Sequence, residues 1–221
     1  MKRTKFFAAL CSTALLLAAC DTSLEPNANQ SNDHDVKNDT KEAVDLGLSV
    51  KWASCNVGAT SETEYGNYYA WAETSTRSEY NWENYKYAFS RSELTKYGVD
   101  TLTTLLAVDD AATVNWGEEW RMPTREEWEE LFDNCTRTWE TKDKIRGYTL
   151  KSKKNGNSIF IPAAGYHHDQ SGYSANHGYY WSSSLCESTP YGAYYVNFDS
   201  DFVNVEVYYR VYGYSIRPVQ E

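Results

Sequence analysis

Residues 194–209 read Tyr-Tyr-Val-Asn-Phe-Asp-Ser-Asp-Phe-Val-Asn-Val-Glu-Val-Tyr-Tyr, and this stretch decides how the C-terminal part of the chain folds. Apolar and polar residues alternate from Val203 to Tyr208, and Val196 and Phe198 alternate in the same way with polar neighbours. Because successive side chains of a strand point to opposite faces, the valines should face the core and the residues between them should face outward. The stretch therefore predicts strands with one buried face and one outward polar face.

The outward face is rich in tyrosine. The last 57 residues, from Gly165, hold 11 of the 19 tyrosines of the chain, no lysine and only two arginines, Arg210 and Arg217. Tyrosine offers a large rigid contact area, and Asn and Ser offer adaptable hydrogen bonds, a mixture that evolved binding surfaces use. The alternative is a solvated strand face with ordinary tyrosines. The tyrosine density alone does not choose between the two.

Upstream patterns predict further strands and long loops. The apolar residues of 46–52 alternate with polar or small ones, which is typical of a half-buried strand, and the aromatic stretch 65–71 is of strand type. Residues 75–108 are mixed and should contain long loops. Residues 178–219 should form three or four more strands joined by short turns.

One helix and one hairpin are also expected. Thr124 and Glu127 have the spacing of a capping box, which starts a helix. The apolar face of that helix follows at helical spacing in Trp128, Leu131, Phe132 and Cys135. Asn155-Gly156 between two apolar runs predicts a tight hairpin in which both residues have a positive φ.

The N-terminus has the pattern of an export signal. A basic start at residues 2–5 is followed by an apolar run that is too short to span a bilayer, so residues 1–19 are predicted to be a cleaved signal peptide. Leu17-Ala18-Ala19-Cys20 resembles the lipobox of bacterial lipoproteins, which implies lipidation of Cys20. Residues 20–43 are polar and predict a flexible tether, and residues 44–221 form the folded domain. The expected location is the bacterial cell envelope, with a lipid anchor in the outer membrane and the domain at the cell surface. The alternative is the inner membrane, since acidic residues after the lipidated cysteine favour surface export in some bacterial groups and inner-membrane retention in others.

The charge balance restricts the partners. Cleavage before Cys20 leaves 18 basic and 31 acidic residues, a net charge of −13. A nucleic-acid binder needs a basic face that displaces counterions from phosphates, so nucleic acid is excluded as a partner. The membrane should be reached through the lipid anchor, since anionic lipid head groups repel such a domain.

Four separated motifs resemble the Fibrobacter succinogenes major paralogous domain. They are residues 45–59 (Asp-Leu-Gly-Leu-Ser-Val-Lys-Trp-Ala-Ser-Cys-Asn-Val-Gly-Ala), residues 120–128 with Trp-Arg-Met-Pro-Thr and Glu-Trp, residues 178–184 (Gly-Tyr-Tyr-Trp-Ser-Ser-Ser), and residues 215–219 (Ser-Ile-Arg-Pro-Val). The resemblance covers residues 44–219. It implies an α+β domain of C-type-lectin-like fold, with antiparallel sheets and one or two helices. Five tryptophans are expected in its core: Trp52, Trp71, Trp120, Trp128 and Trp181.

The same fold is shared by formylglycine-generating enzymes and by the variable proteins of diversity-generating retroelements, whose C-terminal stretch is rewritten at selected codons. The present C-terminus resembles that arrangement, so the domain could be a diversified receptor. Carried over by position, the resemblance implies twelve ligand contacts: Tyr191, Tyr195, Asn197, Asp199, Asp201, Phe202, Asn204, Glu206, Tyr208, Tyr209, Tyr212 and Tyr214.

Catalytic readings are less well supported by the residues. The related oxidases bind copper through paired C-terminal cysteines, whereas this chain has only Cys186 in that region. A metal site from His167, His168 and His177 is not expected, because adjacent histidines on a strand point to opposite faces. Ser182–Ser184 lack a nucleophile elbow, and the glutamates of 126–130 fit a capped, solvated helix better than a glycosidase pair.

The sequence therefore predicts a lipid-anchored domain that binds a protein or glycan without catalysis, cofactor or metal. An oxidase related to formylglycine-generating enzymes, a glycan hydrolase and a structural envelope protein are the alternatives. Cys55 and Cys135 could form a disulfide bond, which an exported location permits, leaving Cys186 as the odd thiol.

Overall fold

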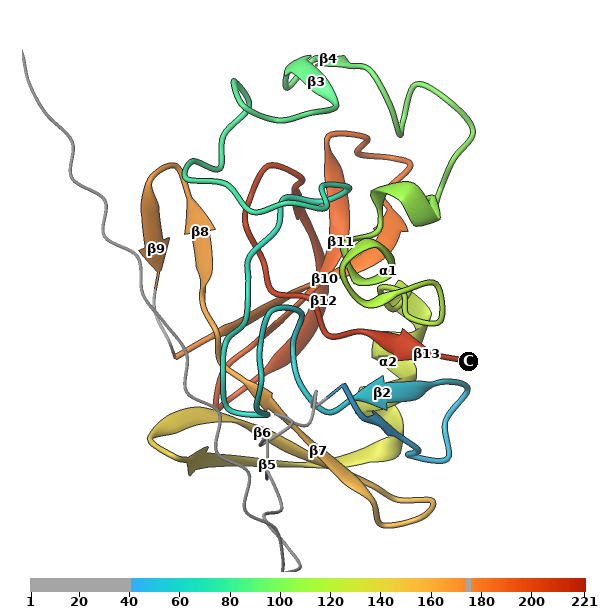
Figure 1. The fold of residues 1–221 in the computed structure, drawn as a ribbon, viewed down its shortest axis with the longest axis vertical. Coiled ribbons are helices and arrows are strands. Elements are labelled where there is room, and N and C mark those ends of the chain that lie inside the picture. The colour runs from blue at the N-terminus through green and yellow to red at the C-terminus, as the bar shows by residue number, and fades with distance from the viewer. Residues whose placement is uncertain (1–40, 174–175) are drawn as a thin grey trace, which may run out of the picture. The chain divides into compact units, whose positions relative to one another are not determined.

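The computed structural model of the chain describes residues 41–173 and 176–221 (Figure 1). The predicted signal peptide 1–19, the predicted lipidation site Cys20 and all but the last three residues of the predicted tether lie outside the described residues. Among the helices of the described part, none combines the length and the apolar character that crossing a membrane requires.

The described residues form small antiparallel sheets with two α-helices, which agrees with the predicted α+β class. The β1–β2–β13 sheet and the β10–β11–β12 sheet have three strands each, as does the β5–β6–β7 sheet, and β3–β4 and β8–β9 are hairpins. The strands are β1 (Ala43–Val44), β2 (Lys51–Ala53), β3 (Ala88–Ser90), β4 (Glu93–Leu94), β5 (Cys135–Lys142), β6 (Ile145–Ser152), β7 (Ser158–Pro162), β8 (Tyr166–His168), β9 (Ser171–Tyr173), β10 (Gly178–Leu185), β11 (Gly192–Phe198), β12 (Val203–Tyr209) and β13 (Val219–Gln220). The helices are η1 (Ala107–Asp109), a single 3₁₀ turn, α1 (Ala111–Trp116) and α2 (Arg125–Asn134).

The β10–β11–β12 sheet confirms the alternation expected for residues 194–209. Val196 lies directly opposite Val205, and Phe198 lies opposite Val203, so these apolar side chains share one face. Val196 and Phe198 are fully buried, and the two valines of β12 pack against the same core cluster. The residues between them on β12 are exposed. One face of the sheet is therefore core. The other face is covered over β10 and β11 by a second core cluster that includes Trp181, Ala193 and Tyr195, and it is open along β12.

Helix α2 begins where the capping box predicts. The Thr124 hydroxyl accepts the amide of Glu127 at 3.2 Å, and the Glu127 carboxylate accepts the amide of Thr124 at 2.8 Å. Trp128 and Leu131 are fully buried, and the helix packs against the β10–β11–β12 sheet. Cys135 is also buried, but it opens strand β5 rather than continuing the helix.

The strand expected over residues 46–52 is wrong in its extent. Leu46, Val50 and Trp52 are indeed buried and Leu48 is half-buried, but residues 45–50 form the loop between the short strands β1 and β2. The Asp45 carboxylate accepts the amide of Gly47, whose φ of +67° is open to glycine. This local turn overrides the alternating pattern. The sheet also begins at Ala43, which lies within the predicted tether.

The aromatic stretch 65–71 forms no named strand either. Tyr69 makes an isolated antiparallel bridge with Tyr214, and the stretch otherwise runs as irregular backbone. The prediction of long loops over residues 75–108 is confirmed, apart from the small β3–β4 hairpin and the start of η1. The five tryptophans expected in the core are all at most 3% exposed.

The two ends of the described domain meet at one sheet. Strand β2 pairs with β1 on one side and with β13 on the other, and Figure 1 shows the C-terminus beside β2. Arg217 fixes this closure from inside the core. Its fully buried guanidinium donates to the side-chain oxygen of Asn56 and to the carbonyls of Ala53 and Phe160. One of the two C-terminal arginines is thus a structural cross-link.

The Asn155-Gly156 hairpin is confirmed between β6 and β7, although only Gly156 has a positive φ. The predicted disulfide is not formed. Cys55 and Cys135 are both buried, yet no bond joins them. The Cys55 thiol donates to the carbonyl of Ala59 within its own turn, whereas Cys135 packs in the core at the end of α2. An exported location permits a disulfide bond, but it does not by itself bring two thiols into bonding geometry.

Candidate functional site

Six tyrosines gather around one hollow on the outward side of the β10–β11–β12 sheet. With Asn197 they line a space of about 180 Å³. The rings come from β8, β10, β11, β12 and the segment that follows β12. We refer to these residues as the tyrosine cluster: Tyr166, Tyr179, Tyr195, Tyr208, Tyr212 and Tyr214.

The strand register places the rings on a common face. Tyr195 pairs with Glu206 on β12 and with Trp181 on β10, so these three side chains point the same way. Tyr208 lies opposite Ala193, whose small side chain leaves room above the sheet. The alternation that places the valines on one face of the sheet therefore places Tyr195 and Tyr208 together on the other face.

Ring contacts run continuously through the cluster. Tyr214 lies at its centre, with ring centroids 5.1 Å from Tyr195 and 5.4 Å from Tyr179. Below it, Tyr214 stacks on the buried Trp181 at 4.2 Å. Above, Tyr208 and Tyr212 meet edge to face at 4.9 Å. Such aromatic pairs hold each other in defined orientations, so the cluster is preorganised.

Burial divides the cluster into a floor and a rim. Tyr195 and Tyr214 are 4% and 2% exposed and form the floor, whereas Tyr208 is 40% exposed at the rim. Burial raises the pKa of Tyr214 well above 10.0, and it raises the pKa of Tyr179 and Tyr195 as well. These phenols are therefore neutral at physiological pH and keep their hydroxyl protons.

Carboxylates adjoin the rings. The Tyr195 hydroxyl donates to Glu206 Oε2 at 3.1 Å, and the exposed Asn204 amide lies 3.4 Å from Glu206 Oε1. The charges of Glu206 and Asp199 act on Tyr179, adding to the rise in its pKa that burial causes first. Asp199 also lies 3.4 Å from His177 Nε2. The hollow is thus aromatic inside and acidic at its border.

The twelve predicted contacts fall into three groups. Five line the hollow: Tyr195, Asn197, Tyr208, Tyr212 and Tyr214. Asn204 and Glu206 are exposed next to them on β12. The remaining five do not line the hollow: Tyr191 and Tyr209 both contact the Arg91 guanidinium with their rings, and Asp199, Asp201 and Phe202 form the β11–β12 turn, from which Asp199 reaches the border of the hollow.

Tyr166 and Tyr179 were not among the predicted contacts, yet both line the hollow. Tyr179 could have been found from its alternation with Trp181 on the same strand. Tyr166 follows Gly165 and opens strand β8, and no local pattern links it to the β10–β11–β12 sheet. Its ring lies 4.8 Å from Tyr179 only because β8 returns alongside the segment after β12.

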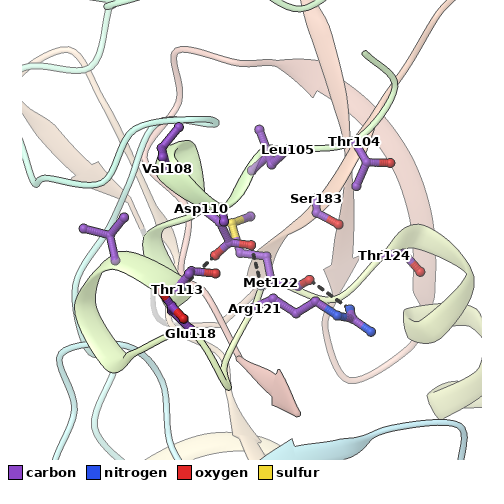
Figure 2. A pocket seen from close by; sticks show the side chains of 12 residues that line it. Thr104, Leu105, Val108, Asp110, Thr113, Glu118, Arg121, Met122, Thr124 and Ser183 are labelled. Atoms are coloured by element: carbon purple, nitrogen blue, oxygen red, sulfur yellow. Dashed lines mark hydrogen bonds between the residues drawn. The ribbon is translucent and has the colours of Figure 1, made fainter. Parts of the chain in front are cut away.

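A larger hollow of about 680 Å³ lies between η1, α1 and the start of α2 (Figure 2). Val108 and Val114 at its border are 70% and 52% exposed. Its polar groups are engaged in the fold. Figure 2 shows Asp110 bonded to the amides of Thr113 and Met122, and its carboxylate also accepts from Ala112.

Arg121 borders the same hollow and is equally occupied. Its guanidinium donates to both carboxylate oxygens of Glu127, to Glu221 and to the carbonyl of Met122. These bonds raise the pKa of Arg121 above its usual range. The hollow is roomy, but two of its charged groups, Asp110 and Arg121, already hold α1 and α2 in place. The tyrosine cluster, whose rim residue Tyr208 is exposed, is the better candidate for recognition.

The residues considered for catalysis also serve the fold. Ser182 Oγ donates to the carbonyl of Tyr194, and Ser183 Oγ lies 3.3 Å from the carbonyl of Pro123. On α2, Glu129 pairs with Arg125 and Glu130 accepts from Ser49. Within the described residues, no group of three or more His, Cys, Asp or Glu side chains could hold a metal ion.

The two adjacent histidines have different surroundings, as expected for neighbours on a strand. His167 packs against Tyr68 and Tyr80, with ring centroids 4.3 and 5.8 Å away, and burial lowers its pKa. His168 instead stacks on Tyr212 at 4.2 Å and extends the tyrosine cluster by one ring.

Comparison with known proteins gives one family match. Residues 139–219 are similar to a family described as Domain of unknown function (DUF8237). The matched segment starts within β5 and contains the whole tyrosine cluster. No curated protein and no solved structure matches the chain.

Proposed function

We propose that this chain is a lipid-anchored protein of the bacterial cell envelope that binds a protein or glycan through the tyrosine cluster. The observation that carries the proposal is the cluster itself: six rings from separate segments surround one hollow and end in an exposed rim. Surfaces selected for binding use the same rigid aromatic contacts next to adaptable amides. Asn197 and Asn204 supply such amides here.

The proposal includes a C-type-lectin-like domain similar to the Fibrobacter succinogenes major paralogous domain. This part of the proposal is supported by the motifs quoted above, whose residues build the core and hold the two ends of the domain together. Trp52, Trp120 and Trp181 are buried, Thr124 caps α2, and Arg217 bonds three segments together. A scaffold held by these motifs can tolerate variation at the outward positions of β11 and β12, which is what a diversified receptor requires.

Binding is tested by screening the mature domain against glycan and protein arrays. The Tyr208→Ala/Tyr212→Ala double variant removes the two rings that meet at the upper part of the cluster. We expect it to lose the array signals. Tyr194→Ala is the matched control, because Tyr194 is a half-buried tyrosine of β11 on the opposite face, packed on Arg125. Unchanged signals in the double variant, with circular dichroism showing a folded domain, would overturn the proposal.

Anchoring is tested separately in cells. Replacing Cys20 by Ser should remove the lipid label and leave the leader uncleaved, because cleavage follows acylation of the cysteine. Protease added to whole cells should cleave the wild-type domain if it is at the surface. A wild-type protein without lipid label, or a label that persists on the Cys20→Ser protein, would contradict lipidation of Cys20, and full protection from protease would contradict surface exposure.

A further inference from the structure

The border of the tyrosine cluster is acidic. Glu206 is exposed and holds the Tyr195 hydroxyl at 3.1 Å, and Asp199 sits at the end of the same strand pair. A third carboxylate, that of Asp169, acts on Tyr212 from the β8–β9 turn. Three negative groups therefore surround rings that are themselves neutral.

Two imidazoles are the basic groups in contact with this acidic border: His177 Nε2 lies 3.4 Å from Asp199, and His168 Nδ1 lies 3.5 Å from Asp169. Within the described part of the chain, the lining of the hollow contains neither lysine nor arginine. Residues 165–221 contain no lysine and only two arginines, Arg210 and Arg217, and both guanidinium groups are fully buried in the core. Within the described residues, neither lysine nor arginine pairs with Glu206, Asp199 or Asp169, so the border keeps its negative charge wherever the two imidazoles are neutral. An anionic ligand would meet repulsion there, because the potential of a site follows its uncompensated charges.

The neighbouring tyrosine pair shows how this surface holds a cation. The Arg91 guanidinium lies 4.2 Å from the Tyr191 ring centroid and 4.6 Å from that of Tyr209. Tyr209 in turn lies 5.0 Å from Tyr208, which forms the rim of the cluster. A cation within about 6 Å of an aromatic face is attracted by the negative potential of the ring. Arg91 of the same chain therefore occupies the Tyr191–Tyr209 pair. The adjoining tyrosine cluster offers the same kind of aromatic ring face to a cation.

We infer that the tyrosine cluster takes a cationic group of its ligand, an ammonium or a guanidinium, with the rings as cage and Glu206 as counter-charge. This inference rests on the proposed binding function and names the chemistry of the group that is bound. The hollow of about 180 Å³ is smaller than the roughly 300–1,000 Å³ typical of sites for whole small molecules. It suits the end of a lysine or arginine side chain, or a quaternary ammonium group.

The test uses pairs of probes in which one member is cationic and the other is neutral. Choline is compared with 3,3-dimethylbutan-1-ol, which has the same shape without the charge, and N-acetyl-lysine amide is compared with its neutral Nε-acetylated form. Affinities come from calorimetry or from shifts of the tyrosine ring signals in nuclear magnetic resonance spectra. We expect each cation to bind about 2- to 30-fold more tightly than its neutral partner, the range that cation–π attraction gives.

Variants assign the preference to the site. Glu206→Gln should weaken choline binding and leave 3,3-dimethylbutan-1-ol unchanged. Tyr208→Phe keeps the ring face and should keep the preference, whereas Tyr208→Ala should reduce it. Tyr194→Ala, on the opposite face, should behave as wild type.

Equal or tighter binding of the neutral probes would overturn the inference, and so would the absence of any choline-dependent shift in the ring signals. A cation preference that survives both Tyr208→Ala and Glu206→Gln would overturn it too. None of these results would touch the proposed function, which fails only if array ligands bind independently of Tyr208 and Tyr212.

Discussion

The hydroxyl of Tyr195 donates a 3.1 Å hydrogen bond to Oε2 of Glu206, which lies directly opposite it across β11 and β12. Tyr195 is 4% exposed, whereas Glu206 is exposed. The bond therefore connects the buried floor of the tyrosine cluster to its charged border. It also fixes the direction of the Glu206 carboxylate, which would otherwise be free to rotate in solvent.

Tyr195→Phe removes this bond while keeping the ring. We expect the free energy of unfolding to fall by about 0.5–1.5 kcal/mol, because a net hydrogen bond contributes about that much and the exposed carboxylate can turn to water. Urea denaturation measures the change. A Tyr195→Phe protein as stable as wild type would show that the bond to Glu206 contributes nothing to stability.

Alkaline pH should destabilise the domain. The pKa of Tyr68 is raised from 10.0 to about 12, mainly by burial, and its hydroxyl donates to the carbonyl of Ala164. The unfolded state therefore releases protons first as pH rises, so the stabilising contribution is complete below pH 10.0 and is lost through about pH 12. Buried Tyr214 acts in the same direction.

The measurement is urea denaturation as a function of pH, together with the absorbance of tyrosinate. Tyr68→Phe should make the decline above pH 10 shallower than in wild type. A free energy of unfolding that stays constant from pH 9 to about pH 12 would contradict the burial of these phenols, since a raised pKa must appear as a loss of stability.

Thr124→Ala should lower the free energy of unfolding by about 0.5–2 kcal/mol, because the first turn of α2 loses its capping acceptor. Thr124→Ser should retain most of the stability, since a serine hydroxyl accepts the same Glu127 amide. Thr101→Ala, at an exposed position in a loop, is the matched control. Thermal and urea denaturation of the four proteins check the prediction, and a Thr124→Ala protein as stable as the control would contradict it.

Asp110→Ala should lower the free energy of unfolding more than Thr124→Ala does. Asp110 is 4% exposed, and its carboxylate accepts three backbone amides, from Ala112, Thr113 and Met122. Leaving buried donors without an acceptor costs about 1–3 kcal/mol each, so we expect a loss of roughly 3 kcal/mol or more. Asp133→Ala on the exposed side of α2 serves as the comparison. A loss no larger than that of Asp133→Ala would show that the carboxylate does not hold α1.

Reducing agent should not change the melting temperature of the domain. Cys55 and Cys135 are buried without a bond between them, so there is no cross-link for a reductant to break. The comparison is made on protein purified without reductant, before and after its addition. A drop in melting temperature that disappears in a Cys135→Ala variant would contradict the structure and restore the predicted disulfide.

Local rules predicted the parts of the fold that local interactions decide. The capping box at Thr124 and the alternation around Val203 depend on neighbours in sequence, and both were correct. The strand over residues 46–52 failed because the Asp45 carboxylate and Gly47 make a turn that hydrophobic alternation does not reveal. Buried positions such as Leu46 and Trp52 were nevertheless identified correctly.

The candidate site could be predicted only in part, because local sequence rules do not show contacts between distant segments. The strand period shows that Asn197 and Tyr208 face away from the valines, but it does not show which outward residues meet. Tyr166 and Tyr179 join the hollow through the return of β8, and Tyr191 and Tyr209 leave it to hold Arg91. These contacts form between loops that are far apart in the sequence. Local sequence patterns do not show which of these loops meet.

The central claim is that ligand binds at the tyrosine cluster rather than at the larger hollow beside α1. Labelled tyrosine rings and valine methyl groups allow both places to be observed in one nuclear magnetic resonance titration with the strongest array ligand. The account predicts that the ring signals of Tyr208 and Tyr212 shift with the ligand while the methyl signals of Val108 and Val114 stay unchanged. Shifts confined to Val108 and Val114 would contradict it.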